Sequence, residues 1–147
     1  MRQPSTPAGV TIDLVAHERA ARAGLRLDLQ PSVHSVTTAR RVAIELLRRA
    51  LGEDEIRVVG LLTSELVTNA VVHTTTPFVL DVTLESGVVR VAVGDGGGGE
   101  PCAQGPGEGA EHGRGLQLVA NLSSRWGTNP FPGGKQVWFE LDVAPPR

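Results

Sequence analysis

The stretch Glu65-Leu-Val-Thr-Asn69-Ala-Val-Val-His73 places a carboxylate, an amide and an imidazole at intervals of four residues. Residues four apart lie on one face of an α-helix, so Glu65, Asn69 and His73 are predicted to form one polar stripe. Apolar residues cover much of the remaining surface, which indicates a mostly buried helix. Buried polar groups without hydrogen-bond partners cost free energy. A bound metal ion and a polar ligand would supply those partners, so this helix is the first candidate for a binding site.

The overall composition limits the class of protein. The chain has 147 residues, 40% of them hydrophobic and 20% charged, which fits one globular domain with its own core. A net charge of −2 gives no electrostatic argument for a nucleic-acid partner. The N-terminus lacks the apolar segment of a secretory signal, and no apolar run approaches the roughly 18 residues of a membrane helix. The single cysteine, Cys102, fits a reducing compartment. We therefore expect a cytoplasmic protein without nucleic-acid or membrane partners.

The N-terminal part of the chain predicts a tail, a strand and a helix. Residues 1–24 show no sustained period and are expected to be a flexible tail, with a short helical turn near residues 16–23. Residues 25–29 alternate apolar and polar side chains, which is typical of a strand. Thr37 or Thr38 is expected to cap a helix that runs to about Leu51, with Gly52 as the glycine after its end. Four arginines, Arg40, Arg41, Arg48 and Arg49, lie largely off its apolar face and are interpreted as solvated.

The rest of the chain predicts a second helix, four strands and a short third helix. Glu53 or Asp54 begins the second helix, and Pro77 follows its end at His73. Ser86-Gly87 is a predicted hairpin turn. The expected strands are 78–85, 88–93, 125–128 and 136–143, with a glycine-rich loop over 94–113 and a helix over 115–122. Helices grouped beside hairpin-paired strands predict an α+β, two-layer sandwich with a mixed, mainly antiparallel sheet over residues 25–143 and a C-terminal tail over 144–147.

Two glycine-rich segments flank the predicted loop. Asp95-Gly-Gly-Gly-Gly99 follows an apolar strand, where a carboxylate can accept a hydrogen bond from an exocyclic amine and glycines let a flat ring approach. Gly113-Arg-Gly115 precedes a predicted helix, whose first backbone N–H groups are free to bind phosphate oxygens. Taken alone, the first segment also fits a flexible linker, and the second fits an ordinary start of a helix.

Taken together and in order, the three segments resemble the GHKL, or histidine-kinase-like, ATPase superfamily. Residues 65–73 look like its N box, residues 95–99 like its first glycine box and residues 113–116 like its second. The short chain and the ending Trp126-Gly127 … Gly134-Lys135-Gln-Val-Trp138-Phe-Glu-Leu141 are most similar to the stand-alone anti-sigma factor serine/threonine kinases of bacteria. The resemblance covers about residues 25–143 and implies a Bergerat-type ATP-binding fold.

The resemblance also implies roles for individual residues. Asn69 would bind Mg²⁺ through its amide oxygen, and Glu65 would be the general base near the γ-phosphate of ATP. Asp95 would accept the adenine amine, and residues 96–112 would form a mobile lid over the nucleotide. The remaining nucleotide-binding residues that the resemblance implies are His73, Gly97, Gly99, Gly113, Arg114, Gly115 and Leu116.

Two functions follow from this resemblance. The first is an ATP- and Mg²⁺-dependent regulatory serine/threonine kinase that phosphorylates an anti-sigma factor antagonist, sequesters a sigma factor and forms a homodimer. The second is a nucleotide-dependent protein-binding module without efficient kinase activity. Family members often carry a threonine beside the adenine, where this chain has Gln136 or Lys135. Lys135 is interpreted as a solvated hairpin residue, and Trp126 and Trp138 as core residues of the last two strands.

Overall fold

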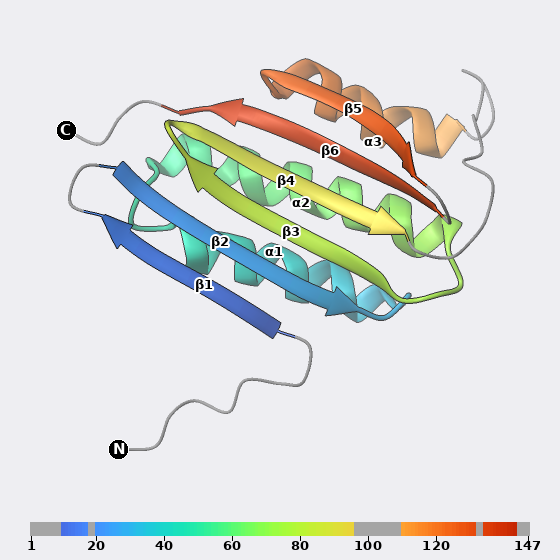
Figure 1. Ribbon diagram of the computed structural model, residues 1–147. Coiled ribbons are helices and arrows are strands. Elements are labelled where there is room, and N and C mark those ends of the chain that lie inside the picture. The colour runs from blue at the N-terminus through green and yellow to red at the C-terminus, as the bar shows by residue number, and fades with distance from the viewer. Residues whose placement is uncertain (1–9, 18–19, 96–109, 132–133, 144–147) are drawn as a thin grey trace.

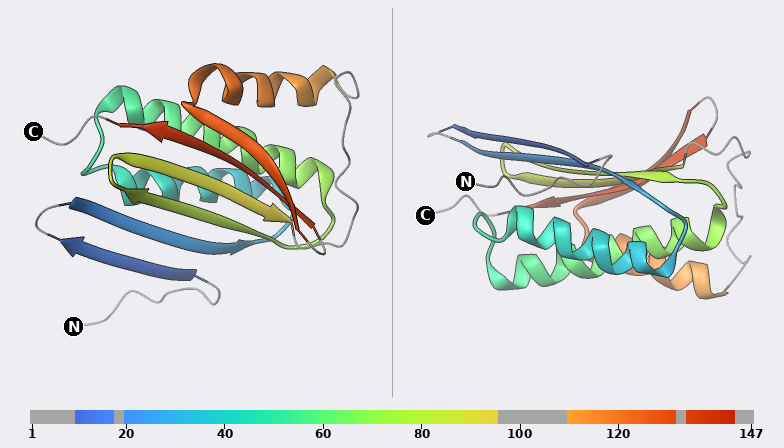
Figure 2. Two further views of the ribbon diagram at one scale, coloured as in Figure 1. Left: turned by 45° about the horizontal axis from the view of Figure 1, so that its top comes forward. Right: turned by 90° about the horizontal axis from the view of Figure 1, so that it is seen from below.

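The computed structural model describes residues 10–17, 20–95, 110–131 and 134–143. Within them lie three helices and six strands, which form two layers (Figure 1). Figure 2 shows that all three helices cover the same face of the sheet. The elements are β1 (Val10–His17), β2 (Ala20–Leu29), α1 (Val33–Leu47), α2 (Glu53–His73), β3 (Phe78–Glu85), β4 (Val88–Asp95), α3 (Ala110–Leu122), β5 (Arg125–Phe131) and β6 (Gly134–Asp142).

The strands form one sheet in the order β1-β2-β3-β4-β6-β5. The predicted two-layer α+β architecture is therefore confirmed. The expectation of a mixed sheet is wrong for the described strands, because each of their five pairings is antiparallel. Two-residue connections join β1 to β2, β3 to β4 and β5 to β6, and such short connections produce antiparallel pairs. The helices α1 and α2 lie between β2 and β3, which also pair antiparallel.

The core lies between the helices and the covered face of the sheet. Alternate residues of β3 point into it, so Leu80 and Val82 are fully buried, and their partners Val93 and Val91 on β4 are buried as well. From the other side, α2 contributes Leu62 and Leu66 among other buried residues. Each fully buried leucine or valine stabilises the fold by roughly 1.5–3 kcal/mol relative to exposure. This packing fixes α2 against β3 and β4, which is what positions its polar stripe.

The expected N-terminal tail is wrong for most of its length. Val10–His17 forms β1, which pairs with β2, and β2 begins at Ala20 rather than at Leu25. A hairpin therefore occupies the place of the predicted helical turn near residues 16–23. The signal for β1 was present, because Val10, Ile12 and Leu14 alternate with Thr11 and Asp13.

The ends of the first helix also differ from the prediction. The cap of α1 is Ser32, whose hydroxyl accepts a hydrogen bond from the backbone N–H of His34 at 3.2 Å. The helix ends at Leu47, earlier than the expected Leu51. Gly52 does not follow α1 as a C-terminal glycine but caps α2, where its N–H donates to Glu55 Oε1 at 3.0 Å. The short connection between α1 and α2 thus gives Gly52 to the second helix.

The second helix and the hairpin after it agree with the prediction. α2 spans Glu53–His73, and Ser86 and Gly87 have φ angles of 52° and 75°. Two consecutive residues with positive φ form the turn that matches the right-handed twist of hairpin strands.

The last two strands are longer than predicted. Trp138 lies on the face of the sheet opposite the helices, and the Arg90 guanidinium carbon is 5.1 Å from its ring centroid. Trp138 is therefore not a core residue, and Trp126 is 39% exposed.

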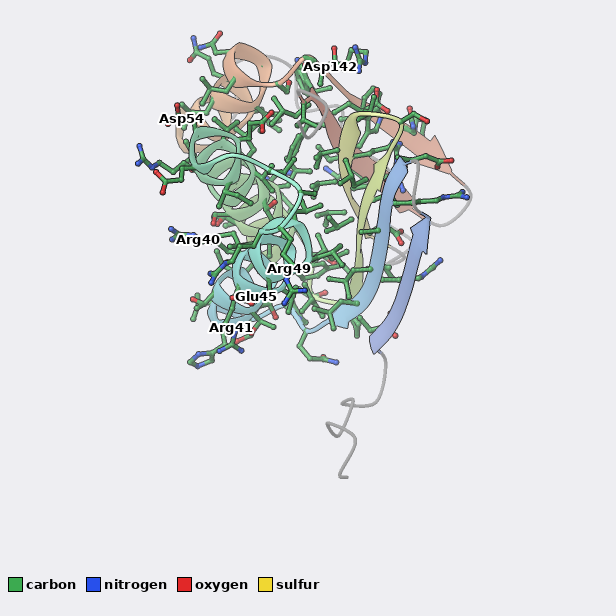
Figure 3. The ribbon with its side chains drawn as sticks, turned by 90° about the vertical axis from the view of Figure 1, so that its left-hand side faces the viewer. Arg40, Arg41, Glu45, Arg49, Asp54 and Asp142 are labelled. Carbon is green, nitrogen blue, oxygen red and sulfur yellow. The ribbon has the colours of Figure 1, made fainter. Side chains whose placement is uncertain are left out.

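The arginines of α1 and of the two positions after its end lie on the solvent side of the helix layer. Figure 3 labels Arg40, Arg41 and Arg49, and all three are exposed, as is Arg48, which pairs with Glu45 at 3.0 Å. Their interpretation as a solvated face is confirmed. No helix within the described ranges is long and apolar enough to span a membrane.

Candidate nucleotide-binding site

A shallow hollow that is partly open to solvent lies between α2 and the strands β4 and β6. Its apolar wall comes from both layers, and three polar residues border it. The lining residues are Leu66, Asn69, Ala70, His73, Val93, Lys135 and Val137. An apolar wall with a few polar groups is the usual composition of a site for a small flat ligand.

The geometry of the hollow follows from two periodicities. Asn69 and His73 are four residues apart on α2 and face the same side, as the sequence predicted. Val93 of β4 and Val137 of β6 are register partners, so both side chains leave the covered face of the sheet next to each other. The predicted nucleotide-binding residues Asn69 and His73 are therefore brought together by the fold.

Glu65, the third residue of the stripe, lies one turn closer to the start of α2 and contacts α3 rather than the hollow. A Cβ atom built on Gly115 of α3 would be 2.7 Å from Glu65 Oε2. Real Cβ atoms do not come this close, so the glycine leaves room for the carboxylate. Glu65 and Asn69 thus share one helix face but lie in different surroundings.

Two polar side chains of the hollow have no partner among the residues that the structure describes. In the described part of the chain, neither Asn69 nor Lys135 makes a hydrogen bond or an ion pair. Both side chains are half-buried. Polar groups that are partly removed from water and lack protein partners remain available to a ligand.

The glycine-box residues are only partly described. Asp95 is the last residue of β4 and pairs in register with Lys135, which places its backbone at the hollow's end of the sheet. Gly97 and Gly99 lie outside the described residues, as does the predicted lid from residue 96 to residue 109. Their roles stay predictions.

The second glycine box lies inside a helix, which corrects the predicted boundary. α3 begins at Ala110, so Gly113, Arg114 and Gly115 occupy its second turn instead of preceding it, and residues 110–112 belong to α3 rather than to a lid. Leu116 is half-buried and packs against the core. Because glycine has a low helix propensity, the prediction from the sequence began this helix too late.

Lys135 is the residue that the sequence analysis misjudged. It lines the hollow and is not a solvated hairpin residue. The neighbouring Gln136 lies toward the other face, where its Oε1 accepts a hydrogen bond from Arg90 Nη2 at 3.4 Å. The missed signal was the alternation of β6: Val137 and Phe139 are both buried, so Lys135, two residues before Val137, shares their face.

The donor set can be compared with the needs of Mg²⁺. Among the described residues, no three or more His, Cys, Asp or Glu side chains are grouped so that they could hold a metal ion. Mg²⁺ is often bound by one or two protein oxygens together with waters and phosphate oxygens. The Asn69 amide oxygen at the hollow, one turn from the Glu65 carboxylate, fits this sparse type of site.

Comparison with known proteins agrees with the fold. Residues 29–141 match the model of the histidine kinase-like ATPase domain family. A search of curated proteins finds no match. Among solved structures, the chain is similar to the RsbU and RsbW domains of Rv1364c from Mycobacterium tuberculosis, with a TM-score of 0.65 and 23% sequence identity. The match covers 84% of this chain and 33% of that one, and at this identity it shows a common fold.

Proposed function

The chain belongs to the histidine kinase-like ATPase domain family, and we propose that it binds ATP with Mg²⁺ in the hollow between α2, β4 and β6. The observation that carries this proposal is the pairing of an apolar wall with the unpartnered polar groups of Asn69 and Lys135. In this proposal the flat base lies against the apolar wall, and the polar side chains bind the polar atoms of the base and the oxygens of the phosphates.

Each proposed site residue has a role in holding the metal ion or the nucleotide. Asn69 would hold Mg²⁺, and the bound ion would supply positive charge to the phosphate oxygens. Asp95, at the end of β4, accepts the adenine amine, and His73 lies beside the nucleotide. Gly97 and Gly99 leave room for the ring, and the second glycine box contacts the phosphates through Gly113, Arg114, Gly115 and Leu116.

We further propose that the chemistry is phosphoryl transfer to a protein hydroxyl. The Glu65 carboxylate takes the proton of a serine or threonine hydroxyl, and that oxygen attacks the γ-phosphorus. The bond from the γ-phosphorus to the bridging oxygen breaks, and ADP leaves. Glu65 suits this role because its carboxylate lies one turn from Asn69 and has no ion pair in the described part of the chain.

The proposed partner is an anti-sigma factor antagonist, and a sigma factor is the second proposed partner. We propose that the protein binds them as a homodimer in the cytoplasm. This partner class rests on the resemblance of the motifs to anti-sigma factor kinases. The similarity in fold to the RsbU and RsbW domains of Rv1364c supports it. The single cysteine also fits a cytoplasmic setting.

A second candidate function is a nucleotide-dependent binding module without efficient transfer. The feature that favours it is Gln136 or Lys135 at the position beside the adenine where family members often carry a threonine. Incubation of the chain with γ-labelled ATP, Mg²⁺ and a purified antagonist separates the two. The kinase proposal expects label on the antagonist. Binding of both ATP and antagonist without transfer would favour the module instead.

A further inference from the structure

Lys135 differs from every other basic residue of this chain. The sequence contains fourteen Lys and Arg residues, of which thirteen are Arg and Lys135 is the only Lys. Lysine is a compact point charge on a flexible stem, whereas arginine carries a wide planar group. The one position with the slim cation is also the one that lines the hollow, next to Asn69 and His73.

The surroundings of Lys135 leave its charge for a ligand. None of the other six lining residues is acidic, and four of them are apolar. Within the described ranges the ammonium group has no ion pair, whereas Arg125, for example, pairs with Glu140 at 2.8 Å. An ammonium group has three donors and no acceptor, so its ligand must present an acceptor atom.

The position of Lys135 along the hollow indicates which part of a nucleotide it meets. Glu65 and Asn69 define the end proposed for the phosphates. His73, at the end of α2, and Asp95, the register partner of Lys135, define the other end. The helix α2 and the strand β4 therefore end, and the strand β6 begins, where the base is proposed to bind. Lys135 is the second residue of β6.

We propose that Lys135 is a base-contacting residue whose ammonium group donates a hydrogen bond to a ring-nitrogen acceptor of the adenine, beside the exocyclic amine. This inference rests on the proposed function, because it assigns a residue to the same nucleotide site. Hydrogen bonds that involve a charged group are stronger than neutral ones.

Because Lys135 is the only lysine, chemical labelling reports on it alone. Acetylation with an amine-selective reagent can modify only Lys135 and the α-amine, and the α-amine is the internal reference for reagent activity. The probes are ATP with Mg²⁺, adenosine, and tripolyphosphate with Mg²⁺. The inference expects ATP and adenosine to slow acetylation of Lys135 relative to the α-amine, and tripolyphosphate to leave it unchanged.

A substitution gives the second readout. Lys135→Met keeps the stem and removes the donor, and is expected to weaken adenosine and ATP binding by the same factor, roughly 10-fold. Lys135→Arg keeps the charge and should lose less. Arg41→Met, on the exposed face of α1, removes a charge far from the hollow and is the matched control.

The outcomes separate this inference from the proposed function. If ATP binds the parent chain but neither it nor adenosine protects Lys135, or if only tripolyphosphate protects it, the base contact is wrong while the nucleotide site stands. A Lys135→Met loss that grows with the number of phosphates would also overturn the base contact. If the parent chain binds none of the nucleotides, the proposed function itself fails.

Discussion

The two faces of the sheet carry polar side chains in two different arrangements. On the uncovered face, Arg125 donates to Glu140 at 2.8 Å and also pairs with Asp142, and Arg90 lies 3.7 Å from the same glutamate. On the helix-covered face, the polar atoms of Asn69 and Lys135 have no partner in the described part of the chain. The charged residues of the uncovered face pair with one another. Asn69 and Lys135 instead border the apolar wall of the hollow.

This difference separates polar groups that serve the fold from polar groups that serve a ligand. An ion pair between two exposed side chains contributes little to stability, and side chains that pair with one another present few unused donors or acceptors. Half-buried groups without partners carry a desolvation cost that the fold does not recover. A ligand recovers it, so substitutions on the covered face are expected to affect binding and chemistry, and those on the uncovered face are not.

Asn69→Ala is expected to have the largest effect. The substitution removes the proposed Mg²⁺ ligand, so Mg²⁺-dependent nucleotide affinity should fall by roughly 10–100-fold and phosphoryl transfer should be lost with it. Calorimetric titration with ATP in the presence and absence of Mg²⁺ measures the affinity. Parental affinity in the variant would remove Asn69 from the metal site.

Glu65→Gln sharpens the comparison within α2 itself. The amide keeps the shape of the side chain and removes the base, so transfer should fall by roughly 10²–10⁴-fold while nucleotide affinity is retained. Single-turnover transfer to a verified protein partner, together with calorimetry, measures both. A variant that transfers at the parental rate shows that another group takes the proton.

Gly115→Ala tests whether α3 positions the Glu65 carboxylate. The new methyl group would lie 2.7 Å from Glu65 Oε2, and the flexible carboxylate must move away. Because misplacement of a reacting group costs roughly up to 100-fold, transfer should fall by about 10- to 100-fold. Stability should not fall, since alanine is the better helix former.

The matched control for this change is Gly94→Ala. Among the described residues, no atom outside the adjoining chain lies within 4 Å of a Cβ built at Gly94, so this variant gains a methyl group without a close contact there. It should transfer phosphate at the parental rate. Equal losses in the two variants would mean that the effect at Gly115 does not come from contact with Glu65.

Asp142→Asn on the uncovered face is expected to have the smallest effect. Hydrogen bonds from Arg125 hold the pKa of Asp142 below its ordinary value. A lowered folded-state pKa contributes stability at pH values above the unfolded pKa of about 3.9, and this contribution is lost as the pH falls through the folded pKa. Thermal unfolding should therefore show a slight deficit of the variant at pH 7 that vanishes in acid, and ATP binding should not change. A change in ATP affinity would contradict the separation of the two faces.

The sequence predicted most of the fold because strong periodicities determine it. α2 and the β3–β4 hairpin were predicted with nearly correct bounds, since a long apolar stripe and a Ser-Gly turn leave few alternatives. β1 was missed because its alternation lies beside prolines and mixed charges. The start of α1 was misplaced because Ser32 and the two threonines are all good caps, and only packing against the sheet decides among them.

The candidate site was predictable where its residues share one element. The spacing within α2 was enough to group Asn69 with His73. The place of Lys135 was not recognised, because it depends on the register of β6 against β4 and on which face of the sheet the helices cover. The contact between Glu65 and Gly115 also needs tertiary structure, since 50 positions separate the two residues.

The central claim is that the hollow between α2, β4 and β6 binds ATP with Mg²⁺, and thermal unfolding of the parent chain tests it most directly. A ligand at 100 times its dissociation constant stabilises the native state by about 2.7 kcal/mol, which corresponds to a rise of roughly 5–10 °C in Tm for a domain of this size. The account predicts such a rise with ATP and Mg²⁺ together and a much smaller one for Asn69→Ala. An unchanged Tm of the parent chain at millimolar ATP and Mg²⁺ would contradict it.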